Sequence, residues 1–159
     1  MNAIVKPNPS SIINSLGLEI RDLVDRLDRG ETVDGWVEKH MKTIEKVVKL
    51  PGDASTRAYY RIWTKEKTFV MMKMENFADQ GMNLPFLTLQ KHLTMSGIDV
   101  PTVLDVDPNR GIILLEDLGD VTLLRCLQDV STPEVERDLY EQVIDSIVDL
   151  QLQASPREG

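Results

Sequence analysis

The chain has 159 residues, with 18 Lys or Arg against 26 Asp or Glu, and so carries a formal net charge of −8. This length suits one domain that buries roughly 68–70% of its unfolded surface. With 28% charged and 42% hydrophobic residues, the composition is that of a globular protein and excludes collagen, coiled coil and wholesale disorder. The acidic balance argues against nucleic acid as a partner, and no RNA-binding signature supports that class.

Other broad features concern the location of the protein. No apolar run reaches the ~18 residues that a membrane span requires, and residues 1–17 lack the apolar core of a signal peptide. The single cysteine, Cys126, cannot form an internal disulfide. We therefore expect a cytoplasmic protein that does not contact the membrane.

The N-terminal part of the chain is expected to be helical. Residues 1–17 are predicted to form a flexible leader, because Pro7, Pro9 and two serines interrupt any pattern. Apolar residues then recur at helical spacing over residues 18–27, and Gly30 ends that helix. A second short helix is predicted over residues 32–41, so residues 18–43 form a helical appendage to a core that starts later.

From residue 44 the hydrophobic period changes to that of β-strands. Strands are predicted over residues 44–50, 58–64 and 69–74, which together form an antiparallel meander. Phe69, Met71 and Lys73 share one face of the third strand. A helix follows at residues 85–96 with Phe86 and Leu89 among its inward residues, ending at Gly97. The last two strands cover residues 102–106 and 112–116, joined by the turn at residues 107–111.

The C-terminal part is again helical. A short helix is predicted over residues 122–127, and a long helix begins at Pro133 after a cap at Ser131 or Thr132. Val135, Leu139, Val143 and Ile147 form one apolar stripe along the long helix. A stripe of this width requires a partner to cover it, and only residues 151–159 follow. We therefore expect the chain to be the N-terminal part of a longer protein.

The segment between the first two strands is a candidate phosphate-binding loop. Its Gly52, Ser55 and Thr56 offer backbone N–H groups and two hydroxyls, although the loop is not a Walker A sequence. It lies in a basic stretch, residues 39–73, which contains nine Lys or Arg but only three acidic residues. Such a stretch suits a small anionic ligand. The alternative is an ordinary hairpin turn among solvated lysines.

Two further candidates lie on the later strands. Lys73, on the apolar face of its strand, matches the V-A-I-K pattern whose lysine holds ATP phosphates; the alternative is a lysine reaching out to water. The corner at residues 116–118 exposes backbone groups that suit an adenine edge. Asp117 and Asp120 are acidic residues at the mouth of the cleft that this corner would line. The alternative is that they cap the next helix or are simply solvated, and for Asp120 this alternative is favoured. His40 and His92 are isolated, so no zinc site is expected.

Three strings together resemble the N-terminal lobe of the aminoglycoside phosphotransferase-like (choline kinase-like) superfamily. They are Gly52-Asp-Ala-Ser-Thr-Arg57 with Tyr60-Arg61, Gly97-Ile-Asp-Val-Pro-Thr-Val-Leu104, and Leu114-Leu-Glu-Asp-Leu-Gly-Asp120. Within the superfamily, the resemblance is strongest to bacterial sugar kinases that act on N-acetylmuramate and N-acetylglucosamine in cell-wall recycling. The strings span about residues 44–127.

The resemblance implies an α+β fold: a protein-kinase-like N-terminal lobe over residues 44–121, with a five-stranded antiparallel sheet and one packed helix. Residues 122–159 would be the helix after the hinge and the start of a truncated C-terminal lobe. Lys73 would contact the α- and β-phosphates of ATP, although the helix that follows carries Phe86, Gln90 and Lys91 where a glutamate partner is expected. The implied ATP-binding residues are Gly52, Asp53, Ala54, Ser55, Thr56, Arg57, Lys73, Glu116, Asp117 and Leu118.

The resemblance also defines what this chain lacks. The catalytic H-x-D-x-x-x-x-N and the later metal-binding Asp are absent, so no catalytic or metal-ligating residue is expected here, and Mg²⁺ would be held mainly by the C-terminal lobe. The expected partners are ATP, a sugar acceptor and the C-terminal lobe of the same protein. The alternative function is a non-catalytic kinase-like interaction or regulatory module, which could dimerise through the apolar stripe.

Overall fold

The structure is a computed structural model that describes residues 9–31, 33, 36–51 and 56–154. The chain divides into two compact units. The sheet unit comprises residues 1–81 and 102–117, and the helical unit comprises residues 82–101 and 118–159. The prediction of a lobe over residues 44–121, which groups the 85–96 helix with the sheet, stays a prediction.

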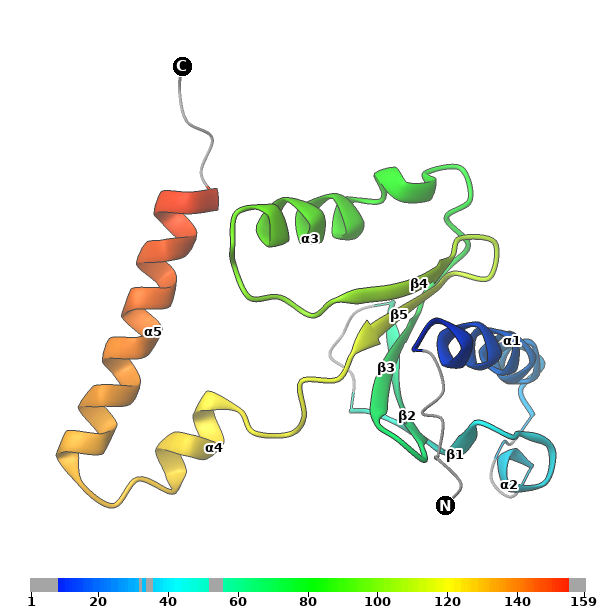
Figure 1. The fold of residues 1–159 in the computed structure, drawn as a ribbon, viewed down its shortest axis with the longest axis horizontal. Helices are drawn as coiled ribbons and strands as arrows, with labels where there is room; N and C mark the ends of the chain where they lie inside the picture. The colour runs from blue at the N-terminus through cyan, green and yellow to red at the C-terminus, as the bar shows by residue number, and fades with distance from the viewer. Residues whose placement is uncertain (1–8, 32, 34–35, 52–55, 155–159) are drawn as a thin grey trace, which may run out of the picture. The chain divides into compact units, whose positions relative to one another are not determined.

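The sheet unit is built on five antiparallel strands, as predicted, and their order is β1-β2-β3-β5-β4 (Figure 1). Residues adjacent in a strand point to opposite faces, so the strand register separates two faces of the sheet. The register places Ile62 opposite Phe69 and Met71 opposite Leu114, so these buried side chains share one face. The strands are β1 (Ile44–Lys49), β2 (Ala58–Thr64), β3 (Thr68–Lys73), β4 (Val103–Asp107) and β5 (Ile112–Glu116).

Helix α1 (Pro9–Asp28) covers that face of the sheet (Figure 1). Its buried residues lie at helical spacing and join the core formed by the inward residues of β1, β2, β3 and β5. Burial of such a side chain stabilises the fold by about 1.5–3 kcal/mol. The core residues of α1 are Leu16, Ile20, Leu23 and Val24.

Two expectations for the N-terminal part need correction. Helix α1 begins at Pro9, so residues 9–17 are helical and do not belong to a flexible leader; residues 1–8 lie outside the described part. The reason is tertiary, because Leu16 is completely buried against the sheet. The second helix, α2 (Val37–His40), is shorter than predicted, and its Val37 is buried. Helix α1 is therefore part of the core.

Polar contacts fix α1 to the start of β1. The carboxylate of Glu19 accepts hydrogen bonds from the backbone N–H groups of Lys42, Thr43 and Ile44 at 2.9–3.0 Å. Three successive N–H groups turned toward one carboxylate form an anion nest. The side chain thus satisfies donors that the entry into the sheet would otherwise leave unpaired.

A second set of polar contacts joins α1 to the β4–β5 turn. Arg110 in the turn bonds to Asp25 at 2.9 Å, and Arg21 bonds to Asp107 at 3.0 Å. Burial raises the pKa of Asp107, but hydrogen bonds from the Arg110 backbone and from both guanidinium groups outweigh it and hold the pKa below its ordinary value. In the same turn Gly111 has φ +64°, and a Cβ there would overlap the carbonyl oxygen of Met74. The turn therefore requires glycine at this position.

The helical unit contains α3 (Pro85–Met95), α4 (Leu123–Gln128) and α5 (Pro133–Ala154), and a single 3₁₀ turn spans Gly81–Asn83. Helix α3 ends in a Schellman motif at Gly97, as predicted: Ile98 N–H donates to the Leu93 carbonyl, and Gly97 N–H to that of Thr94.

The inward face of α3 differs from the prediction, because Leu87 is buried whereas Leu89 is 57% exposed. The prediction followed helical spacing from Phe86, but the buried residues are Leu84 and Leu87, three positions apart. The cap on α5 agrees with expectation, since the Thr132 hydroxyl accepts from Val135 N–H. The cap on α4 is Thr122, whose side chain accepts from Arg125 N–H, so the predicted helix started one residue too early. Helix α5 carries exposed apolar residues, among them Val135, Tyr140, Ile144, Ile147, Val148, Leu150 and Leu152.

We expect Glu19→Ala to lower the free energy of unfolding by about 1–3 kcal/mol, because backbone donors near the core lose their acceptor. Urea denaturation followed by circular dichroism measures the change. The control is Glu45→Ala on β1, where the side chain is exposed and the loss should stay within about 0.5 kcal/mol. Equal losses for the two variants would show that the anion nest does not stabilise the fold.

Candidate functional site

The candidate site residues lie at the two ends of the sheet. Glu116 ends β5 and pairs with Phe69, whereas Lys73 pairs with Ile112 at the other end of the same ladder. Phe69 and Lys73 are four positions apart on β3, a separation of roughly 13 Å along the strand. Ala58, which follows the 51–57 loop, pairs with Lys73. The structure therefore places Ala58 and Lys73 at one end of the sheet, the loop end, and Glu116 at the opposite end.

At the loop end, three cationic residues gather. Lys49 is the last residue of β1, Arg57 directly precedes β2, and Lys73 is the last residue of β3. Of the predicted loop residues, Gly52, Asp53, Ala54 and Ser55 lie outside the described part of the chain. Thr56 is exposed and Arg57 is partly buried. Three of the nine cations of the basic stretch thus lie at the loop end, whereas Lys65 and Lys67 lie in the β2–β3 turn at the opposite end.

Lys73 has an acidic partner that the sequence did not reveal. Its Nζ lies 3.3 Å from Oδ1 of Asp28, at the end of α1, and donates to the Met74 carbonyl at 3.2 Å. The side chain is 19% exposed, on the same face as Phe69 and Met71, as predicted. The anion that this lysine reaches in the structure therefore comes from the preceding α1.

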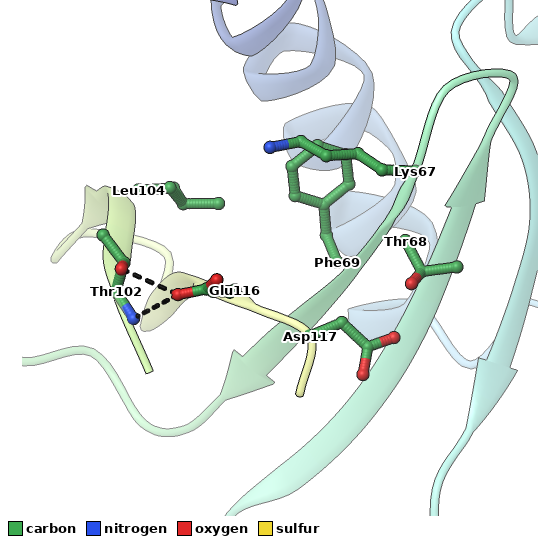
Figure 2. Close-up of a pocket in the computed structure, with 7 residues that line it drawn as sticks. All are labelled: Lys67, Thr68, Phe69, Thr102, Leu104, Glu116 and Asp117. Atoms are coloured by element: carbon green, nitrogen blue, oxygen red, sulfur yellow. Dashed lines mark hydrogen bonds between the residues drawn. The ribbon is translucent and has the colours of Figure 1, made fainter. Parts of the chain in front are cut away.

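At the opposite end, Glu116 is held by Thr102. The Glu116 carboxylate accepts from the Thr102 hydroxyl at 2.8 Å and from its backbone N–H at 3.2 Å, while Glu116 N–H donates to the Thr102 carbonyl (Figure 2). The hydroxyl bond is the main reason that the pKa of Glu116 lies below its ordinary value, and the charge of Lys67 adds to it. Glu116 is thus fixed as a carboxylate.

The Asp117 side chain points away from Glu116 (Figure 2). It is held by Arg61 of β2. Arg61 Nη2 donates to Oδ1 at 3.0 Å, and Nε lies 2.8 Å from Oδ2. The two side chains are only 11% and 4% exposed. Leu118, the next residue, begins the helical unit and is 68% exposed. Sequence reasoning gave Arg61 no role, although an arginine among the apolar residues of a strand requires a buried partner.

A pocket of about 260 Å³ lies beside Glu116 and Asp117 (Figure 2). It combines an aromatic wall, Phe69, with a cation, Lys67, and with carboxylates that are already engaged. Lys67 Nζ lies 4.9 Å from the centre of the Phe69 ring. The pocket is lined by Lys67, Thr68, Phe69, Thr102, Leu104, Glu116 and Asp117.

The described residues show neither a metal site nor a membrane span. Among them, no three His, Cys, Asp or Glu side chains cluster as metal ligands would. Likewise, none of their helices combines the length and the apolar character needed to cross a bilayer.

Comparison with known proteins gives one consistent name. No protein-family model matches the chain. N-acetylmuramate/N-acetylglucosamine kinases of Caulobacter vibrioides, Neisseria meningitidis and Pseudomonas aeruginosa are 26%, 31% and 30% identical to it over 68%, 67% and 74% of its length. The chain covers 36%, 30% and 32% of these relatives, about a third of each. These matches support a kinase-related family.

We expect Thr102→Val to raise the pKa of Glu116 toward its ordinary value, because the carboxylate loses the hydroxyl donor that most favours its charged form. With the pKa lowered in the folded state, this bond stabilises the fold above the ordinary glutamate pKa and is lost as the pH falls through the lowered one. A carbon-detected NMR titration of Glu116 measures the change. The control is Thr88→Val at an exposed position on α3, which should leave the pKa of Glu116 unchanged.

Proposed function

We propose that this chain is the ATP-binding N-terminal lobe of a phosphotransferase that transfers the γ-phosphate of ATP to a hydroxyl of a sugar or amino sugar. The observation that carries the proposal is the shared name of three relatives that match two thirds or more of the chain. The antiparallel sheet with helix α1 is compatible with a kinase-like lobe.

The charge distribution supports a nucleotide that lies along β3. Lys49, Arg57 and Lys73 at the loop end of the sheet would attract the phosphates. The backbone from Glu116 to Leu118, at the opposite end, would bind the adenine edge. The distance between the two ends, roughly 13 Å, leaves room for the ribose between base and phosphates.

The transfer itself would depend on residues outside this chain. Mg²⁺ would neutralise charge on the phosphates, and a catalytic aspartate would orient the acceptor hydroxyl. In this proposal the lobe would bind and orient ATP and would be inactive by itself. Acceptor choice would then be determined elsewhere in the complete enzyme.

The exposed apolar residues of α5 favour a second candidate, a non-catalytic interaction module. Such a module would self-associate or bind a partner through α5 and would not respond to ATP. Light scattering combined with nucleotide titration separates the two candidates, because only the ATP-binding lobe gains affinity for nucleotide.

We expect the 159-residue chain to bind the fluorescent analogue TNP-ATP and to release it when ATP is added. The displacement titration measures the dissociation constant, and ATP should also raise the melting temperature by mass action. A chain that neither binds the analogue nor gains thermal stability at millimolar ATP is not a nucleotide-binding lobe.

We expect Lys73→Met to weaken ATP binding about tenfold, equivalent to ~1.4 kcal/mol, because a cation near the phosphates is lost. The matched variant is Asp28→Asn, which keeps Lys73 but removes the carboxylate that now holds it. Its ATP affinity should be equal or higher. If Lys73→Met binds ATP as tightly as the unmodified chain, the lysine serves only to fix α1.

A further inference from the structure

The pair Arg61–Asp117 links parts of the sheet that are not hydrogen-bonded to each other. Arg61 lies in the middle of β2, and Asp117 directly follows β5, with β3 between the two strands. Arg61 is opposite Val70, and Val70 is opposite Leu115, so the three residues form a row across the sheet. Asp117 lies two residues beyond Leu115, and the guanidinium therefore crosses β3 to reach it.

This row lies on the face of the sheet opposite α1. Residues adjacent in a strand point to opposite faces, and Arg61 is the neighbour of Ile62, which is buried in the core under α1. In the same way Asp117 is the neighbour of Glu116, whose strand position is opposite Phe69. The pair is thus separated from the Lys73–Asp28 contact by the sheet itself.

A buried pair of this kind imposes geometry more than it adds stability. Two buried charges lose their hydration, so a buried ion pair contributes little compared with apolar side chains of similar volume. The hydrogen bond from Nη2 to Oδ1, with Nε 2.8 Å from Oδ2, nevertheless restricts how the carboxylate can lie against the planar guanidinium. With side chains 11% and 4% exposed, the pair therefore fixes the backbone at the end of β5 in one conformation.

We infer that Arg61 is a positioning residue for nucleobase recognition, because by holding Asp117 it fixes the backbone of residues 116–118 that would bind the adenine edge. The inference rests on the proposed function and adds a residue to it. Asp117 accordingly acts through its backbone, and its carboxylate serves Arg61. The phosphate end of the site, four residues along β3, does not depend on the pair.

The test uses the double variant Arg61→Met/Asp117→Asn of the 159-residue chain, which removes both charges with little change in volume. It is compared with the unmodified chain for affinity toward ATP and toward inorganic tripolyphosphate, which has phosphates but no base. We expect at least tenfold weaker ATP binding and unchanged tripolyphosphate binding. A merely structural role would alter the two affinities together or neither.

Two further variants guard the interpretation. Arg61→Lys keeps the charge but loses the planar fork, and should give an intermediate loss of ATP affinity with no loss for tripolyphosphate. It remains informative if the double variant does not fold, which circular dichroism reports. The matched control is Arg110→Met/Asp25→Asn, which breaks an arginine–aspartate pair on the α1 side and should change neither affinity.

The outcomes separate the inference from the function on which it rests. An unmodified chain that binds neither ATP nor tripolyphosphate refutes the proposed function and the inference with it. An unmodified chain that binds ATP, together with a folded double variant of equal ATP affinity, overturns the inference alone.

Discussion

The docking of α1 on the sheet is the constraint on which the rest of the structure depends. Four apolar residues of α1 complete the core, and polar contacts at Glu19, Arg21, Asp25 and Asp28 attach the helix to β1, the β4–β5 turn and β3. Because the apolar contacts and the ion pairs act at different points along the helix, its rotation and its translation are both fixed. One face of the sheet is thereby covered by α1.

Two ion pairs between a basic residue and an aspartate lie on opposite faces of this sheet. Lys73–Asp28 lies on the α1 face and is partly exposed, whereas Arg61–Asp117 lies on the opposite face and is almost completely buried. An exposed pair contributes little and can be exchanged for another anion, whereas a buried pair cannot lose one partner without leaving an uncompensated charge. The two ends of β3 are therefore suited to different tasks. The Lys73–Asp28 pair can exchange its anion, whereas the Arg61–Asp117 pair is fixed.

Much of the sheet could be predicted from the sequence, because local signals there agree with tertiary structure. The alternation of side chains correctly predicted the limits of β2, and Gly97 correctly predicted the end of α3, where the backbone requires a positive φ. The predicted start of α1, at residue 18, was wrong, because contact with the sheet extends the helix through residues 9–17, which the local sequence pattern does not show. The partners of Lys73 and Arg61 were also missed, because they lie 45 and 56 residues away and depend on strand register. The loop residues 52–55 and the division into domains stay predictions.

The glycine in the β4–β5 turn limits where the sheet unit can vary. With no room for a side chain at Gly111, and with Arg110 and Asp107 both bonded to α1, this turn tolerates neither insertion nor substitution without loosening the helix. The β2–β3 turn closes through hydrogen bonds of Thr64 to Glu66 and Lys67, and Lys65 and Glu66 at its tip are exposed. Affinity tags, reporter loops or new binding segments should therefore be grafted between Lys65 and Glu66, which leaves Lys67 in the pocket beside Glu116.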